Sequence, residues 1–130
     1  MAASVATARM HTRTVLEGWR LHSLLDDAVL VVSEIVSNAI KATNAIPSQA
    51  RYPELYDRLE VICLCLYLYG DEVQIEVWDR KQGAPELREA ALEDEGGRGL
   101  WLVESLSRAW GIRWAVTGGK VVWARVAASE

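Results

Sequence analysis

DDAVLVVSEIVSNAIKAT, the stretch from Asp26 to Thr43, is the most strongly patterned part of this 130-residue chain. One face carries Glu34, Asn38 and Lys41, and the first two are four residues apart, so their side chains lie one above the other on a helix. The apolar residues around them recur at helical spacing and predict one amphipathic helix with a buried face. They are Leu25, Ala28, Val29, Val32, Ile35, Val36, Ala39 and Ile40.

Two interpretations of this polar face are open from spacing alone. Polar residues four apart are expected on the solvated side of any surface helix, and the pair is then ordinary. In the second interpretation a carboxylate and an amide stand together to handle a metal ion, a phosphate or a water molecule. The rest of the chain has to decide between them.

The segments around this helix predict further helices and strands. Residues 4–19 carry a patchy apolar stripe and predict a first helix, whereas residues 44–53, with two prolines, predict a loop. Residues 59–68 form a continuous apolar run, and residues 72–79 alternate between apolar and polar. Because Gly70 and Asp71 make a turn between these two runs, the pair predicts a β-hairpin.

The second half of the chain begins with a charged segment, residues 80–97, which predicts a long lid loop. Residues 99–110 predict a helix that Gly111 would cap. Residues 112–116 and 121–126 predict a second hairpin, closed by a glycine turn. This order predicts a single α+β domain over residues 1–130. We expect a two-layer sandwich with helices on one face of a mostly antiparallel, mixed sheet.

The composition disfavours several classes of function. The net charge is −4, the sequence pI is about 5.2 and no long basic run occurs, so we expect no nucleic-acid or membrane partner. No apolar run reaches the roughly 18 residues of a membrane span, and the N-terminus lacks a signal-peptide pattern, so we expect a cytoplasmic protein. Buried positions are expected for the side chains of Cys63, Cys65, Leu16, Trp19 and Trp101.

Two further features can complete a site around the polar helix face. Asp79 ends an apolar strand directly before the long loop, and Gly96-Gly97-Arg98-Gly99-Leu100 opens a helix. A helix N-terminus presents unpaired N–H groups, and glycines let a phosphate approach the backbone closely. Each feature also has an ordinary explanation. Asp79 can be a turn residue that ends a strand, and the glycines can form a flexible joint between loop and helix.

Taken together, four segments resemble the GHKL (Bergerat-fold) ATPases, a superfamily that includes gyrase, Hsp90-type chaperones and histidine kinases. The chain is most similar to the small actinobacterial ATP-binding proteins of the anti-sigma-factor serine kinase type. The segments, which follow the family's order, are SEIVSNAIKAT (33–43), VQIEVWDRKQGAP (73–85), GGRGLWLVESLSRAWG (96–111) and GGKVVWARV (118–126).

The resemblance implies a role for each matching residue. Glu34 would be the general base, and Asn38 would be the ligand of a Mg²⁺ ion that bridges the phosphates of ATP. Lys41 would lie on the cofactor side of the same helix. Asp79 would accept a hydrogen bond from the adenine amino group. The glycine-containing segments would supply the remaining cofactor contacts, from Gly83, Gly97, Arg98, Gly99 and Leu100.

The same resemblance implies a serine/threonine protein kinase that uses ATP and Mg²⁺ and regulates transcription. Its partners would be a small anti-anti-sigma protein, a sigma factor or both, and a homodimer would be plausible. The chain departs from the family at Arg80–Gln82, where a glycine-rich run is usual, and at Val121, where a threonine near the adenine is often found. The alternative is therefore a protein-interaction module, with or without bound nucleotide, that transfers no phosphoryl group.

Overall fold

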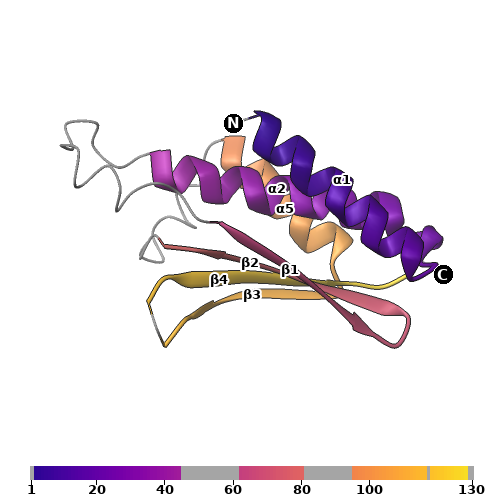
Figure 1. Ribbon diagram of the computed structural model, residues 1–130. Coiled ribbons are helices and arrows are strands. Elements are labelled where there is room, and N and C mark those ends of the chain that lie inside the picture. The colour runs from indigo at the N-terminus through magenta and orange to yellow at the C-terminus, as the bar shows by residue number, and fades with distance from the viewer. Residues whose placement is uncertain (1, 45–61, 81–94, 117, 129–130) are drawn as a thin grey trace.

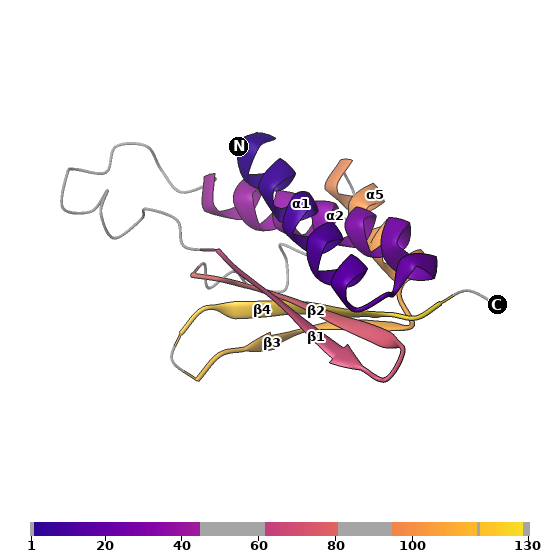
Figure 2. The same cartoon turned by 45° about the vertical axis from the view of Figure 1, so that its right-hand side comes forward.

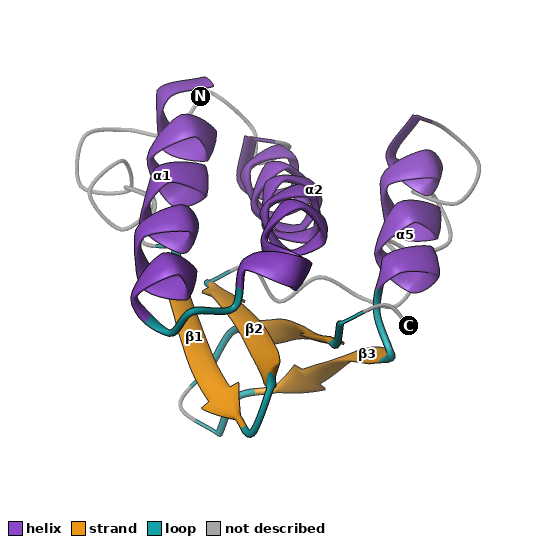
Figure 3. Cartoon of the chain, turned by 90° about the vertical axis from the view of Figure 1, so that its right-hand side faces the viewer, coloured by secondary structure: helices purple, strands orange, loops and turns teal. Residues whose placement is uncertain are grey.

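The computed structural model of the protein describes residues 2–44, 62–80, 95–116 and 118–128. Its helices are α1 (Ala2–Gly18), the 3₁₀ turn η1 (His22–Leu24), α2 (Leu25–Asn44) and α5 (Glu95–Leu106). Its strands are β1 (Cys63–Tyr69), β2 (Glu72–Asp79), β3 (Ala109–Trp114) and β4 (Lys120–Val126). The α-helices lie side by side on one face of the sheet (Figures 1 and 3), which confirms the predicted two-layer α+β sandwich.

The four strands form one sheet in the order β1-β2-β4-β3, and each neighbouring pair is antiparallel. The two predicted hairpins, β1–β2 and β3–β4, are confirmed. The chain joins them through α5, and β4 then pairs over its whole length with β2, from Val126 opposite Val73 to Lys120 opposite Asp79. The end of β2 is therefore placed beside the start of β4.

Figure 2 shows the helices and the sheet as two layers, and the buried core cluster takes residues from both of them. The apolar face of α2 contributes Val32 and Ile35, which are at most 1% exposed, and every second residue of β2 faces them. The inward-facing β2 side chains Val73, Ile75 and Val77 are 0% exposed. Burial of this kind stabilises a fold by about 25 cal/mol per Å² of apolar surface, so α2 is held to the sheet mainly by its predicted apolar stripe.

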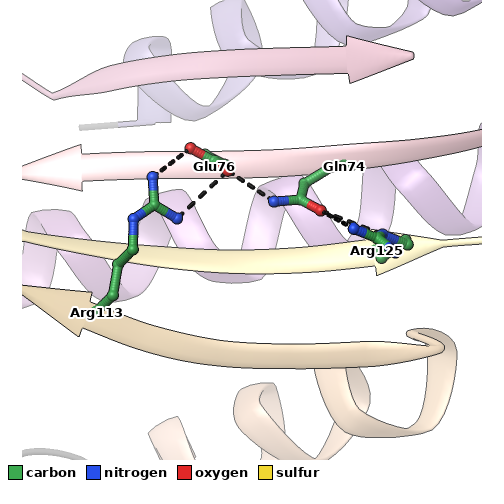
Figure 4. Close-up of polar contacts among 4 residues, drawn as sticks. All are labelled: Gln74, Glu76, Arg113 and Arg125. Atoms are coloured by element: carbon green, nitrogen blue, oxygen red, sulfur yellow. Dashed lines mark hydrogen bonds and ion pairs between the residues drawn. The ribbon is translucent and has the colours of Figure 1, made fainter. Parts of the chain in front are cut away.

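The outer face of the sheet carries a row of polar contacts (Figure 4). Arg113 donates to Glu76 at 2.8 Å, Gln74 donates to Glu76 at 2.7 Å, and Arg125 donates to Gln74 at 2.7 Å. The guanidinium of Arg125 also lies 4.7 Å from the centre of the Tyr69 ring. The hydrogen bonds from Arg113 lower the pKa of Glu76 below its ordinary value. This row links β2 to β3 and β4 on the side away from the helices.

Several sequence predictions about single positions were wrong. Cys63 and Cys65 are exposed, because they alternate with the inward-facing Leu64 and Leu66 on an edge strand. Trp101 is 64% exposed, because α5 turns the neighbouring Leu100 toward the interior instead. Leu16 is buried and Trp19 half-buried, as expected.

In the described segments, no helix combines the length and the apolar character that a membrane crossing needs.

The boundaries after the lid also differ from the prediction. The helix begins at Glu95 and ends at Leu106, so residues 95–97 are helical rather than part of a loop. Gly111 does not cap this helix but lies inside β3, beneath the indole of Trp123. A Cβ at position 111 would lie 3.0 Å from Trp123 Nε1, so the glycine makes room for the ring. The remainder of the predicted lid, residues 81–94, and the predicted loop over residues 45–53 lie outside the described residues.

Candidate functional site

The polar face of α2 holds the first two candidate residues. Glu34 and Asn38 are both half-buried, whereas the residues on either side of Glu34, Ser33 and Ile35, are 5% and 1% exposed. No hydrogen bond or ion pair to another described residue engages the side chain of Glu34 or Asn38. The carboxylate and the amide therefore lie one turn apart on the same face of α2, and both are partly shielded from water.

A hydrogen-bonded pair fixes α2 next to this face. Arg9 on α1 donates from Nε to the Ser33 hydroxyl at 2.7 Å, and Ser33 donates to the Val29 carbonyl one turn earlier at 2.9 Å. The Ser33 hydroxyl therefore both accepts and donates a hydrogen bond within the protein, in contrast to the side chain of Glu34 beside it. Its role is to orient α2 against α1.

Asp79 lies at the end of β2 and is 0% exposed. A buried carboxylate needs a compensating cation or hydrogen-bond donors, since an unpaired charge is strongly disfavoured away from water. The ammonium of Lys120 lies 3.4 Å from Oδ1 and 3.3 Å from Oδ2 of this carboxylate. Lys120 is itself only 8% exposed, so the two form a buried ion pair across β2 and β4.

Lys120 is the site residue that the sequence analysis missed. Val121, where the resemblance expects a threonine near the adenine, pairs with Trp78, and its side chain therefore points to the face of the sheet away from Asp79. A signal was present in the sequence, because Lys120 is a charge among the alternate residues Val122, Ala124 and Val126, which are otherwise apolar. Only the register between β2 and β4 shows that this charge lies opposite Asp79.

A tight glycine turn makes this close pairing possible. Gly119 has a φ of 83°, and a Cβ there would lie 2.4 Å from the Asp79 carbonyl oxygen and 2.8 Å from Trp78 Nε1. Trp78 in turn donates from its indole to the Gly118 carbonyl at 3.0 Å. Position 119 therefore tolerates only glycine, and the turn before β4 is fastened to the end of β2.

The glycine cluster lies in the first turns of α5, which packs beside α2. The backbone of Gly97, Arg98 and Gly99 is helical, and Leu100 is 7% exposed. The first turn of α5 lies at the end of the helix that points away from the sheet (Figure 3). Its leading N–H groups have no partner within the helix, and helix N-termini of this kind favour negatively charged groups.

The structure brings some of the predicted site residues to one end of the molecule, and the side chains of others lie outside its described part. The second half of α2, the end of β2 and the start of β4 lie at the same end of the molecule (Figure 1), so Asn38, Asp79 and Lys120 come from neighbouring elements. Lys41 lies in the last turn of α2, and its side chain, like that of Arg98, is outside the described part. Gly83 also falls outside the described residues.

The Asn38 amide and the Asp79 carboxylate are chemically suited to a nucleotide that carries a hard cation such as Mg²⁺. The Asn38 amide oxygen is the type of ligand that Mg²⁺ takes in proteins, with water and phosphate oxygens completing its shell. Among the described residues, no three His, Cys, Asp or Glu side chains gather as a metal site. The buried Asp79 carboxylate offers an acceptor to the amino group of a base.

Comparison with known families agrees with this geometry. The family of histidine kinase-like ATPase domains matches residues 1–126, which is nearly the whole chain. No curated protein sequence matches significantly. The match includes every candidate residue named above, on α2, β2, α5 and β4. This chain belongs to the histidine kinase-like ATPase domain family.

Proposed function

We propose that this protein binds ATP with Mg²⁺ and transfers the γ-phosphoryl group to a serine or threonine of a small anti-anti-sigma partner. The observation that carries the proposal is the half-buried pair of Glu34 and Asn38 on α2, whose second half shares one end of the molecule with the wholly buried Asp79 (Figure 1), in a chain that belongs to an ATPase family. We further propose that it acts in the cytoplasm and also binds a sigma factor, as anti-sigma-factor kinases do.

In the proposed site each residue has one task. Asp79 accepts a hydrogen bond from the base, and Asn38 would hold Mg²⁺, which would supply positive charge beside the phosphates. Glu34 takes the proton of the attacking hydroxyl while that oxygen bonds to phosphorus and the bond to the ADP oxygen breaks. Gly97, in the first turn of α5, is proposed to offer its backbone N–H to a phosphate oxygen, and Arg98, Gly99, Lys41 and Gly83 are proposed as further contacts.

A second function has its own support. Lys120 already pairs with Asp79, and Arg80-Lys81-Gln82 follows where glycines are usual in the family. A protein-interaction module that has lost phosphoryl transfer would tolerate both features. The two functions differ in turnover, so an experiment has to measure binding and transfer separately.

The test combines calorimetry with label transfer. We expect ATP to bind the wild-type protein more tightly with Mg²⁺ than without it, and Asn38→Ala to remove this Mg²⁺ dependence. We expect Glu34→Gln to keep ATP binding and to lower label transfer from [γ-³²P]ATP to anti-anti-sigma proteins at least a hundredfold. Binding without transfer to any of these proteins would favour the interaction module. Absence of ATP binding would refute the kinase and the nucleotide-binding form of the interaction module.

A further inference from the structure

Lys120 is a buried ammonium in a row of apolar side chains. The residues of β4 that face the helices are Lys120, Val122, Ala124 and Val126, and all but the first are apolar. A buried ion pair rarely stabilises a fold more than well-packed apolar residues of similar volume would. Packing alone therefore does not explain a lysine at this position.

The geometry of the pair places a hydrogen-bond donor and an acceptor next to each other. The ammonium lies 3.3–3.4 Å from the two Asp79 oxygens, whereas a strong bond of this type measures about 2.7–2.9 Å. A carboxylate has about four acceptor directions, and an ammonium has three donors. Asp79 and Lys120 therefore present an acceptor and a donor side by side, from adjacent strands, on the helix side of the sheet.

We propose that Lys120 is a specificity-determining residue of the base subsite. The inference rests on the proposed function, in which Asp79 accepts from the amino group of adenine. Lys120 then donates to the ring nitrogen beside that amino group, which is N1 on one edge of adenine and N7 on the other. The pair reads a base that carries a donor next to an acceptor. The long, flexible side chain of lysine allows the ammonium to move from the carboxylate toward the base.

Nucleotides that lack one ring nitrogen test this role. Calorimetry compares ATP with 1-deaza-ATP and 7-deaza-ATP, in which CH replaces N1 or N7. We expect one of the two to bind the wild-type protein about tenfold more weakly than ATP, since a hydrogen bond to a charged group is lost. Lys120→Met should bind ATP and that analogue equally, and Lys120→Arg, which keeps a donor, should preserve the preference.

A matched control removes a cation from the other face of the sheet. Arg113 on β3 is 53% exposed at its side chain and pairs with Glu76 on the outer face. Arg113→Met should therefore leave the ratio of ATP to deaza-ATP affinity unchanged. Equal binding of ATP and both analogues by the wild-type protein would overturn the inference, as would a preference that survives in Lys120→Met.

A measurement on the wild-type protein does not depend on how the methionine variant folds. The chain has three lysines, so their Nζ resonances are few, and the Lys120 signal can be identified by its loss in Lys120→Arg. We expect this signal to shift on addition of ATP and to stay in place with the weaker analogue. If ATP does not bind at all, the proposed function fails together with this inference. If ATP binds and the Lys120 signal does not respond, only the role of Lys120 is refuted.

Discussion

Single residues decide how closely β2 and β4 approach at the candidate site. Lys120 can lie opposite Asp79 only because Gly119 lacks a Cβ, since that atom would fall 2.4 Å from the Asp79 carbonyl oxygen. The three glycines Gly18, Gly70 and Gly119 differ in this respect. Gly18 and Gly70 have open space around them, and of these two only Gly70 has a positive φ, of 60°.

Alanine substitution of these glycines should therefore give a graded series. We expect Gly119→Ala to lower the free energy of unfolding by about 3 kcal/mol or more, from steric overlap and the left-handed backbone together. Gly70→Ala should lower it by about 1–2 kcal/mol from the backbone alone. Gly18→Ala, at the end of a helix with room for a methyl group, should be neutral or slightly stabilising. Urea unfolding followed by tryptophan fluorescence measures all three.

Equal stabilities of the Gly119 and Gly18 variants would contradict this account of the turn.

Individual residues also show which contacts could be predicted from the sequence and which could not. Glu34 and Asn38 were predicted as neighbours because helical periodicity is local. Lys120 was missed because its contact with Asp79 depends on a strand register between segments 41 residues apart. Gly111 was misassigned because its reason, the indole of Trp123, comes from the opposite strand.

At the scale of elements, the outer face of the sheet is joined by charge as well as by backbone hydrogen bonds. Glu76 accepts from Arg113 and Gln74, and these contacts lower its pKa from the ordinary value of 4.5. A carboxyl group with a lowered pKa in the folded protein stabilises the fold when it is ionised. Its contribution is fully present above the unfolded pKa and disappears as the pH falls through the folded pKa.

Glu76→Gln should therefore destabilise the protein in a pH-dependent way. At pH 7 we expect a loss of about 0.5–1 kcal/mol, a small value because Arg113 is largely exposed. The difference from wild type should shrink as the pH falls below about 4.5. Urea unfolding at a series of pH values measures it. Glu104→Gln on the exposed side of α5 is the control and should change stability by less than about 0.5 kcal/mol at any pH. A loss at Glu76 that does not vary with pH would refute the ionic explanation.

The order and type of the elements could be predicted from the sequence because each carries its own periodic pattern. The boundaries of α5 could not, since glycine disfavours a helix interior by about 1 kcal/mol relative to alanine. The structure nevertheless includes Gly96, Gly97 and Gly99 in α5, where the helix packs against α2. Tertiary contact thus outweighed local preference, and Trp101 was turned outward by the same packing.

At the scale of the whole molecule, the candidate site lies on the helix side of the sheet, and the polar row of Gln74, Glu76, Arg113 and Arg125 lies on the opposite face. The second half of α2, the end of β2 and the start of β4 share one end of the molecule, whereas the β1–β2 turn lies at the other end (Figure 1). The central claim is that a nucleotide binds at the first of these ends. It predicts that nucleotide binding protects the backbone at this end of the molecule and leaves the other end unchanged.

Hydrogen exchange with and without Mg-ATP tests this claim most directly. We expect slower exchange in peptides that cover residues 34–41, 77–80, 96–103 and 119–122, because the ligand would shelter these backbone groups. Exchange should stay unchanged at the β1–β2 turn, residues 69–72, and at the end of α1. The result that would contradict the account is saturating Mg-ATP that leaves the first set unprotected, or that protects the outer face and the β1–β2 turn instead.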